Sequence, residues 1–131
     1  METKARILIV DDNAAIRRLL VEILTRAGHQ VYQAADGAEA LVWREVGLDL
    51  LIVDLFMPDK DGIETILEFR ASVPGIAIIA ISGGGAGGSR LDLLKDAELL
   101  GAAVSIEKPF TPAELLEAVD QALRGSGPGP T

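Results

Sequence analysis

Carboxylates, a hydroxyl and an ammonium group follow four apolar runs of the sequence, and together they could transfer a phosphoryl group. The runs are continuous and apolar, which is the pattern of strands that are buried on both faces of a sheet. In open α/β sheets, ligands bind at the carboxyl ends of such strands. The polar groups and the runs that they follow are Asp11 and Asp12 after 7–10, Asp54 after 50–53, Ser82 after 76–81, and Lys108 after 103–106.

Three clustered carboxylates suit a hard cation that prefers oxygen ligands, and Mg²⁺ is the expected one. Without such a cation, the adjacent carboxylates of Asp11 and Asp12 would repel each other. A carboxylate oxygen of Asp54 could attack phosphorus and form an acyl phosphate. The metal ion, the Ser82 hydroxyl and the Lys108 ammonium would then stabilise the new anion.

Each of these residues also has a simpler interpretation. Asp54 could cap the loop that follows it. Asp11, Asp12 or Asn13 could cap the next helix, and such capping can coexist with metal binding. Five unrelated polar groups would not be expected at the ends of the right strands in this order, so the combination favours one common site.

These side chains can meet only if the apolar runs are parallel strands of one sheet. Apolar residues at helical spacing lie between the runs, so strand and helix alternate five times. This alternation predicts an α/β fold of the flavodoxin-like type, a (βα)5 doubly wound parallel sheet with helices on both faces and strand order 2-1-3-4-5. The predicted strands are 7–10, 31–34, 50–54, 76–81 and 103–106, and the predicted helices are 13–27, 38–46, 62–72, 89–100 and 111–124.

Composition limits the classes of function. The 131 residues are 49% hydrophobic, which fits one domain with a full core, here 4–124. The net charge of −8 argues against direct binding of nucleic acid, and the apolar runs are too short to span a membrane. The absence of cysteine and of a signal peptide suits the cytoplasm. Residues 125–131 are Gly, Ser, Pro and Thr, so we expect a flexible tail or the start of a linker.

With these residues in place, the chain resembles the receiver domain of bacterial two-component response regulators over residues 4 to about 124. The resemblance implies that a sensor histidine kinase or a histidine phosphotransfer protein donates a phosphoryl group to Asp54. The modified domain would change conformation and signal to an output domain or a downstream protein through the face of its fourth helix, fifth strand and fifth helix. It would promote its own phosphorylation and dephosphorylation without being a turnover enzyme.

The resemblance also implies a role for each site residue. Ser82 resembles the switch hydroxyl that turns toward the phosphate. Lys108 resembles the lysine that pairs with a phosphate oxygen, with Pro109 after it in cis linkage. Pro58 and Gly62 match the turn that follows the acceptor strand. The implied Mg²⁺ ligands are the side chains of Asp11 (largely through water), Asp12 and Asp54, and the backbone carbonyl of Phe56.

Three features depart from the family pattern. Ser105 stands where an aromatic residue usually swings inward on activation, so a relay would have to use Ser82 and its loop. That loop has five glycines within 83–88, and contact of the phosphate with Ser82 could order it. Phe56 could shield the acyl phosphate from water, in which case a Phe56→Asn variant would lose its phosphoryl group faster.

Other functions compete with this interpretation. A haloacid dehalogenase-type phosphatase needs an aspartate two residues after the nucleophile, where Phe56 stands. An FMN-binding flavodoxin module needs a hydroxyl-rich loop after the first strand, whereas Asp11 and Asp12 would repel the flavin phosphate. A degenerate receiver that binds partners without phosphorylation is the remaining alternative. Outside the site, we expect Trp43 to pack against the fold and His29, in a predicted turn, to be solvated and without a role.

Overall fold

The computed structural model describes residues 4–55, 62–82 and 104–125 of the chain. The predicted helix 89–100, the glycine-rich loop 83–88, Phe56, Pro58 and the tail beyond residue 125 lie outside these ranges.

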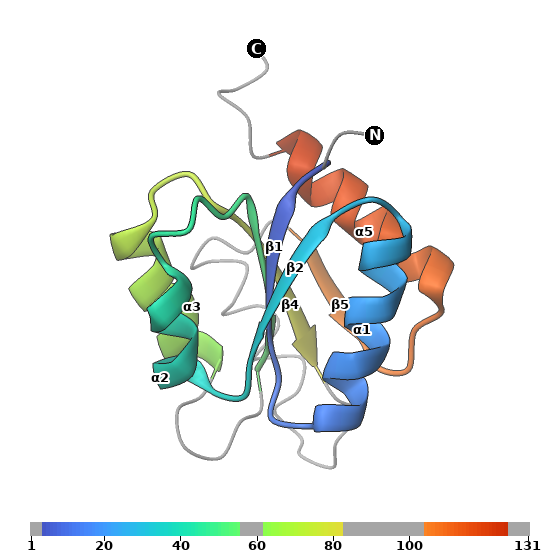
Figure 1. The fold of residues 1–131 in the computed structure, drawn as a ribbon, viewed down its shortest axis with the longest axis horizontal. Coiled ribbons are helices and arrows are strands. Elements are labelled where there is room, and N and C mark those ends of the chain that lie inside the picture. The colour runs from blue at the N-terminus through green and yellow to red at the C-terminus, as the bar shows by residue number, and fades with distance from the viewer. Residues whose placement is uncertain (1–3, 56–61, 83–103, 126–131) are drawn as a thin grey trace.

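A five-stranded parallel sheet forms the middle layer of the molecule (Figure 1). The strand order is β2-β1-β3-β4-β5, so the predicted doubly wound fold is confirmed. Val10 pairs with Val53, and Asp54 pairs with Ile81, which brings the carboxyl ends of the three central strands to one edge. The strands are β1 (Arg6–Val10), β2 (Gln30–Ala34), β3 (Leu50–Asp54), β4 (Ala77–Ser82) and β5 (Val104–Glu107).

Helices cover both faces of this sheet (Figure 1). α1 (Ala14–Arg26) and α5 (Pro112–Gly125) lie on one face, and α2 (Gly37–Ala40) and α3 (Gly62–Ser72) lie on the other. Side chains of a strand alternate between the two faces. In β1, accordingly, Ile7 and Ile9 pack in the core under α1 and α5, whereas Leu8 and Val10 pack in the core under α2 and α3. Both faces of the central strands are therefore buried, as their continuous apolar runs predicted.

The second predicted helix, 38–46, is wrong in length. α2 ends at Ala40 and continues as a 3₁₀ helix, η1 (Leu41–Trp43). Asp36 caps the start by accepting a hydrogen bond from the backbone N–H of Glu39 (2.8 Å). The ring centroid of Trp43 lies 4.9 Å from that of Tyr32 on β2, and Trp43 packs against the core, so its expected packing is confirmed.

The expectation that His29 is solvated is also wrong, because only 8% of its surface is exposed. Backbone hydrogen bonds hold the turn around it against β1 and α1. Lys4 N–H donates to Gly28 O (3.1 Å), and His29 N–H donates to Leu24 O (3.1 Å). Among the residues that the structure describes, the imidazole Nδ1 has no hydrogen-bond partner.

Candidate functional site

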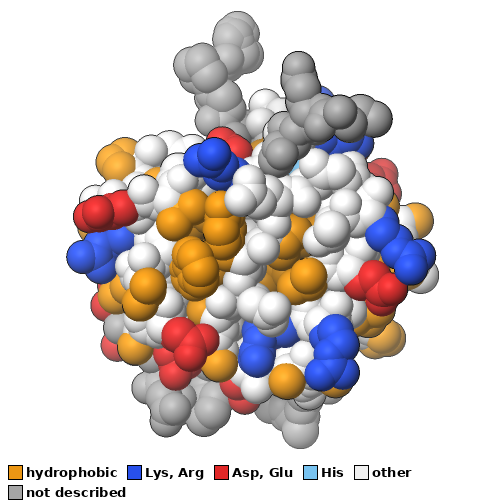
Figure 2. All heavy atoms as spheres, in the orientation of Figure 1, with side chains coloured by type: hydrophobic (Ala, Val, Ile, Leu, Met, Phe, Trp, Pro, Cys, Tyr) orange, Lys and Arg blue, Asp and Glu red, His pale blue; other side chains and the backbone are white. Residues whose placement is uncertain are grey.

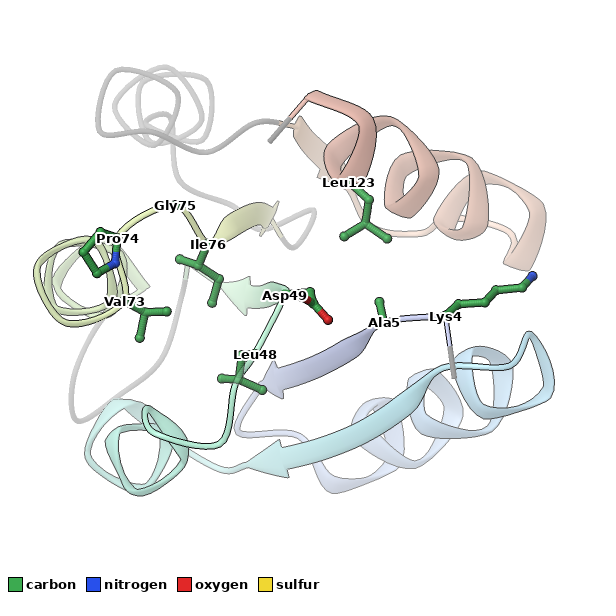
Figure 3. Close-up of a pocket in the computed structure, with 9 residues that line it drawn as sticks. All are labelled: Lys4, Ala5, Leu48, Asp49, Val73, Pro74, Gly75, Ile76 and Leu123. Atoms are coloured by element: carbon green, nitrogen blue, oxygen red, sulfur yellow. The ribbon is translucent and has the colours of Figure 1, made fainter. Parts of the chain in front are cut away.

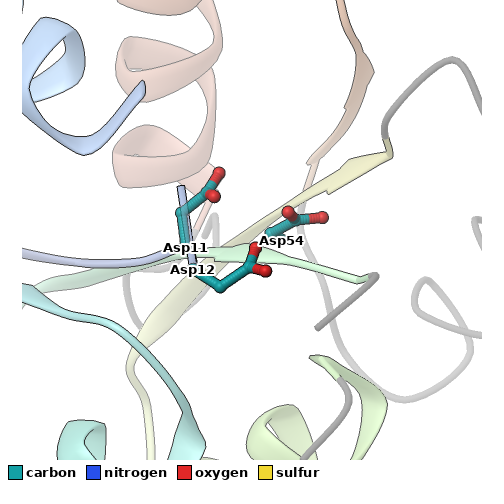
Figure 4. Close-up of side chains that lie close together, drawn as sticks. All are labelled: Asp11, Asp12 and Asp54. Atoms are coloured by element: carbon teal, nitrogen blue, oxygen red, sulfur yellow. The ribbon is translucent and has the colours of Figure 1, made fainter. Parts of the chain in front are cut away.

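The carboxylates of Asp11, Asp12 and Asp54 meet at the carboxyl edge of the sheet (Figure 4). One oxygen of each lies within 4.8 Å of the other two. Asp11 and Asp54 are buried, with 1% and 5% of their surfaces exposed, whereas Asp12 is exposed to solvent. The structure therefore brings together the three acidic residues that the sequence singled out, and it leaves one of them open to an incoming ion.

Strand register explains why these residues meet. β1 and β3 are neighbours, and Val10 pairs with Val53. The next residue on each strand is therefore an aspartate at the same level of the sheet. Asp11 N–H still donates to Ala34 O of β2 (3.2 Å), which keeps the end of β1 in the sheet plane.

Two donors hold the carboxylate of Asp11. The backbone N–H of Asn13 donates to its Oδ1 (2.9 Å), and Lys108 Nζ donates to its Oδ2 (3.2 Å). Asn13 in turn caps α1, because its side chain accepts a hydrogen bond from Ile16 N–H (3.0 Å). Capping and the acidic cluster therefore coexist at this turn, with Asn13 as the cap.

Lys108 connects the two buried carboxylates of the site. Its Nζ lies 3.2 Å from Asp11 Oδ2 and 3.4 Å from Asp54 Oδ2. Its side chain is 20% exposed, so these ion pairs are only partly screened by water. The Lys108–Pro109 bond, directly after β5, is cis, as the resemblance implies. Lys108 thus reaches the cluster from a different strand and can meet a ligand that approaches Asp54.

The donor set of the cluster fits a divalent cation. Among the described residues, three carboxylates gather here, and the ammonium group of Lys108 lies beside two of them. All of the side-chain donors are hard oxygen atoms, which Mg²⁺ prefers. Both oxygens of Asp11 already accept hydrogen bonds, whereas the carboxylate of Asp12 is exposed and accepts none from the described residues. Asp12 is therefore the better placed of the two for direct contact with a metal ion.

Ser82 is the last residue of β4, on the strand next to Asp54. Asp54 pairs with Ile81, so the backbone of Ser82 lies one step beyond Asp54 at the same edge, where it pairs with Glu107. Phe56, whose carbonyl the resemblance adds to the ligand set, lies outside the described residues.

The sequence analysis assigned no role to Arg17, a residue of α1. Arg17 Nη1 donates to the backbone carbonyl of Asp11 (2.6 Å), and its Nε donates to Gln33 Oε1 on β2 (3.2 Å). The guanidinium therefore ties the turn after β1 to the end of β2. A helical arginine six residues after an aspartate carries no motif that would have revealed this contact.

A cavity of about 410 Å³ lies at the opposite, amino edge of the sheet (Figure 3). Lys4 and Asp49 are the charged residues among those that line it. The Asp49 carboxylate accepts a hydrogen bond from the backbone N–H of Arg6 (2.9 Å), which ties the start of β3 to the start of β1. Among the described residues, the acidic cluster lies at the other edge, the carboxyl edge of the sheet.

The surface and the helices add two observations. Figure 2 shows acidic and basic side chains interspersed on the face that carries β2, without a continuous basic area. Within the described ranges, no helix is long and apolar enough to cross a bilayer.

Comparison with known proteins points to one family. The family model described as the response regulator receiver domain matches residues 7–120. Sporulation initiation phosphotransferase F of Bacillus subtilis is 35% identical over 90% of this chain and 93% of its own length. The transcriptional regulatory protein CpxR of Klebsiella pneumoniae is 38% identical over 92% of this chain, which spans only 50% of that relative. A CheY-like receiver domain protein of Methanospirillum hungatei has 32% identity and a TM-score of 0.81 over 93% of this chain and 95% of its own.

Proposed function

The chain belongs to the response regulator receiver domain family, and we propose that it is a phosphorylation-controlled switch with Asp54 as the phosphoryl acceptor. A receiver domain is a signalling component of a two-component system rather than a turnover enzyme. The observation that carries the proposal is the surroundings of Asp54: Lys108 Nζ lies 3.4 Å from its Oδ2, and the carboxylates of Asp11 and Asp12 lie beside it.

The donor that we propose is a phosphohistidine of a sensor kinase or of a phosphotransfer protein. A carboxylate oxygen of Asp54 attacks phosphorus and forms an acyl phosphate, while the phosphorus–nitrogen bond breaks. The imidazole of the donor keeps the electron pair of that bond and takes up a proton. Lys108 Nζ, already within reach of Asp54, then pairs with an oxygen of the transferred group. The Ser82 hydroxyl is proposed as a second donor to it.

Asp11, Asp12, Asp54 and the carbonyl of Phe56 would hold the Mg²⁺ ion. When bound, the ion would offset the repulsion between the acidic groups and the phosphoryl oxygens. Asp11 orients this site through its bonds to Asn13 N–H and Lys108, and Asp12 offers the exposed carboxylate.

Signalling would follow from the change in charge at Asp54. A phosphoryl group competes with Asp11 for Lys108, so the contacts at the ends of β1, β3 and β5 rearrange together. The recipient of the signal is a downstream protein or an output domain in the same polypeptide. With a net charge of −8, this chain would not itself bind nucleic acid, and we propose a cytoplasmic location.

Treatment with acetyl phosphate and Mg²⁺, followed by intact mass spectrometry, tests the proposal. We expect a phosphoryl adduct on the wild-type chain and on an Asp120→Ala control, which removes an exposed carboxylate of α5. We expect no adduct on Asp54→Ala. If the wild type binds Mg²⁺ but acquires no adduct, the domain is a degenerate receiver that binds partners without phosphorylation.

A further inference from the structure

We propose that two copies of the chain associate through the outer edge of β2, which joins their sheets into one continuous sheet across a two-fold axis. β2 is the first strand in the sheet order, and within the described ranges it pairs with β1 alone. Figure 1 shows β2 between α2 and α1, with no described helix or strand over its outer edge. The backbone groups along such an edge can pair with a further strand.

The hydrogen bonds of β2 identify the backbone groups that face outward. Gln30 N–H donates to Ala5 O (2.9 Å), so Gln30 faces β1. Successive residues of a strand direct their backbone groups to alternate sides, so Tyr32 also faces β1. Val31 and Gln33 therefore direct their N–H and C=O groups away from the sheet, where the described residues supply no partner.

The unpaired edge ends on both sides of these two residues. His29 N–H donates to Leu24 O (3.1 Å). Ala35 N–H donates to the carboxylate of Glu39 (2.6 Å). The part of the edge that can pair is therefore short, and it is arranged symmetrically about Tyr32, with an outward donor and an outward acceptor on each side.

A second copy of the same edge satisfies all of these groups. In an antiparallel arrangement with Tyr32 opposite its own copy, Val31 lies opposite Gln33 of the other chain, and this pair exchanges two N–H···O=C bonds. The two-fold axis repeats the pair on the other side of Tyr32. No outward backbone group of Val31 or Gln33 is then left without a partner.

The side chains around the axis also favour a second copy as the partner. A two-fold axis brings a charge near it close to the same charge on the other chain, and two chains of net charge −8 repel each other. The side chains of β2 are uncharged, so this edge avoids the repulsion. The ring of Tyr32, whose centroid lies 4.9 Å from that of Trp43, would face its own copy, and cross-strand aromatic pairs stabilise antiparallel strands. Figure 2 shows hydrophobic side chains in the middle of this face.

Sedimentation equilibrium of the unmodified full chain tests the association, because the inference does not rest on phosphorylation of Asp54. Two five-residue strands make a small contact, so we expect a monomer–dimer equilibrium with a Kd on the order of 100 µM. A wild-type chain that stays monomeric at about 1 mM, tenfold above this Kd, would overturn the proposal.

A proline at position 33 tests the backbone groups. Gln33→Pro removes an outward N–H and leaves the ladder with β1 intact, because proline is tolerated where the N–H of an edge strand faces solvent. Each dimer loses two hydrogen bonds, so the Kd should rise by about tenfold or more. Gln33→Ala also removes the side-chain bond to Arg17 but keeps the N–H, and its Kd should stay within about twofold of wild type. Equal Kd values for the two variants would overturn pairing through this strand.

A charge exchange at residue 32 tests the position of the axis. Tyr32→Lys and Tyr32→Glu each place like charges opposite each other, so each variant alone should dimerise about threefold or more weakly than wild type. In an equimolar mixture, lysine can face glutamate across the axis, so the mixture should contain more dimer than either variant alone. A mixture that is no more associated than its components would overturn this register.

Amide hydrogen exchange of the wild-type chain locates the contact without any substitution. The amides of Val31 and Gln33 should exchange about threefold more slowly at about 1 mM protein than at about 50 µM, because the dimer protects them. The amide of Tyr32, already bonded to β1, should change less. Slowing of the Val104–Glu107 amides in place of Val31 and Gln33 would overturn association through β2.

Discussion

Gly62, the first residue of α3, lies directly against the backbone of Asp54. Its N–H donates to Leu55 O (3.3 Å). A Cβ atom at residue 62 would lie 2.6 Å from Leu55 Cα and closer still to the carbonyl oxygen of Asp54. Only glycine therefore lets α3 approach the strand end that carries the proposed phosphoryl acceptor.

A Gly62→Ala substitution should accordingly destabilise the fold. The added Cβ atom would meet backbone atoms of Asp54 and Leu55, which cannot move aside without distorting β3. We therefore expect a loss of about 1–3 kcal/mol in the free energy of unfolding. Urea titration followed by the fluorescence of Trp43, the only tryptophan, measures it. Ser72→Ala, at the exposed end of the same helix, should change stability by less than about 0.5 kcal/mol. A Gly62→Ala protein as stable as wild type would contradict the close approach.

If the folded cluster holds Mg²⁺, the ion should raise the melting temperature of the wild-type chain relative to EDTA, because the unfolded chain lacks the site. Asp12→Asn should remove most of this increase, since Asp12 offers the exposed carboxylate. Glu45→Gln, which removes an exposed carboxylate far from the cluster, should retain the full increase. Differential scanning fluorimetry over a series of MgCl₂ concentrations distinguishes these outcomes, and an equal increase in all three proteins would exclude the cluster as the site.

Lys108→Met should affect metal binding and phosphoryl transfer in opposite directions. Removing the ammonium group from beside Asp11 and Asp54 leaves the carboxylates less compensated, so the affinity for Mg²⁺ should rise by about threefold or more. The rate of adduct formation with acetyl phosphate should fall, because the cation that meets the phosphoryl oxygens is gone. Isothermal titration calorimetry and mass spectrometry measure the two effects. A fall in both would mean that the substitution simply disorders the site.

The fold was predictable because its strands are short, continuous apolar runs separated by helical patterns. The acidic cluster was predictable for the same reason: once Asp11 and Asp54 end neighbouring parallel strands, register alone brings them together. What these residues do at the site stays a prediction until the phosphorylation and metal-binding experiments are done.

The errors arose where tertiary contacts decide the structure. The helical pattern over 38–46 does not reveal that α2 gives way to a 3₁₀ turn, where Trp43 makes a tilted ring contact with Tyr32. His29 lies in a polar turn that two backbone hydrogen bonds hold against the core. Lys4 N–H donates to Gly28 O, and His29 N–H donates to Leu24 O. Arg17 donates a hydrogen bond to the backbone carbonyl of Asp11, and only the folded turn brings that carbonyl within its reach.

Arg17→Ala should loosen the turn that carries Asp11 and Asp12. It removes the 2.6 Å bond to Asp11 O and the bond to Gln33, so we expect a loss of about 1 kcal/mol in stability. The affinity for Mg²⁺ should fall by about threefold or more, because the carboxylates are less well oriented. Arg18→Ala removes an exposed neighbour of the same charge and is the matched control. Loss of a positive charge alone would raise the affinity for Mg²⁺, so an equal rise in both variants would contradict the orienting role of Arg17.

His29 should make the stability of the fold depend on pH. Burial, with a smaller contribution from Lys4, lowers the pKa of His29 below 6.5, while Asp120 opposes the shift. As the pH falls through about 6.5, the unfolded chain binds a proton that the folded chain resists, so stability decreases until the folded pKa is reached.

His29→Gln should therefore lose less stability than wild type between about pH 7.5 and pH 5.5, where the carboxylates contribute equally to both proteins. Asp120→Asn should lose more than wild type, because the charge that supports protonated His29 is gone. Urea titrations at the two pH values measure these differences. The same decrease in wild type and His29→Gln would show that the imidazole is not the group responsible.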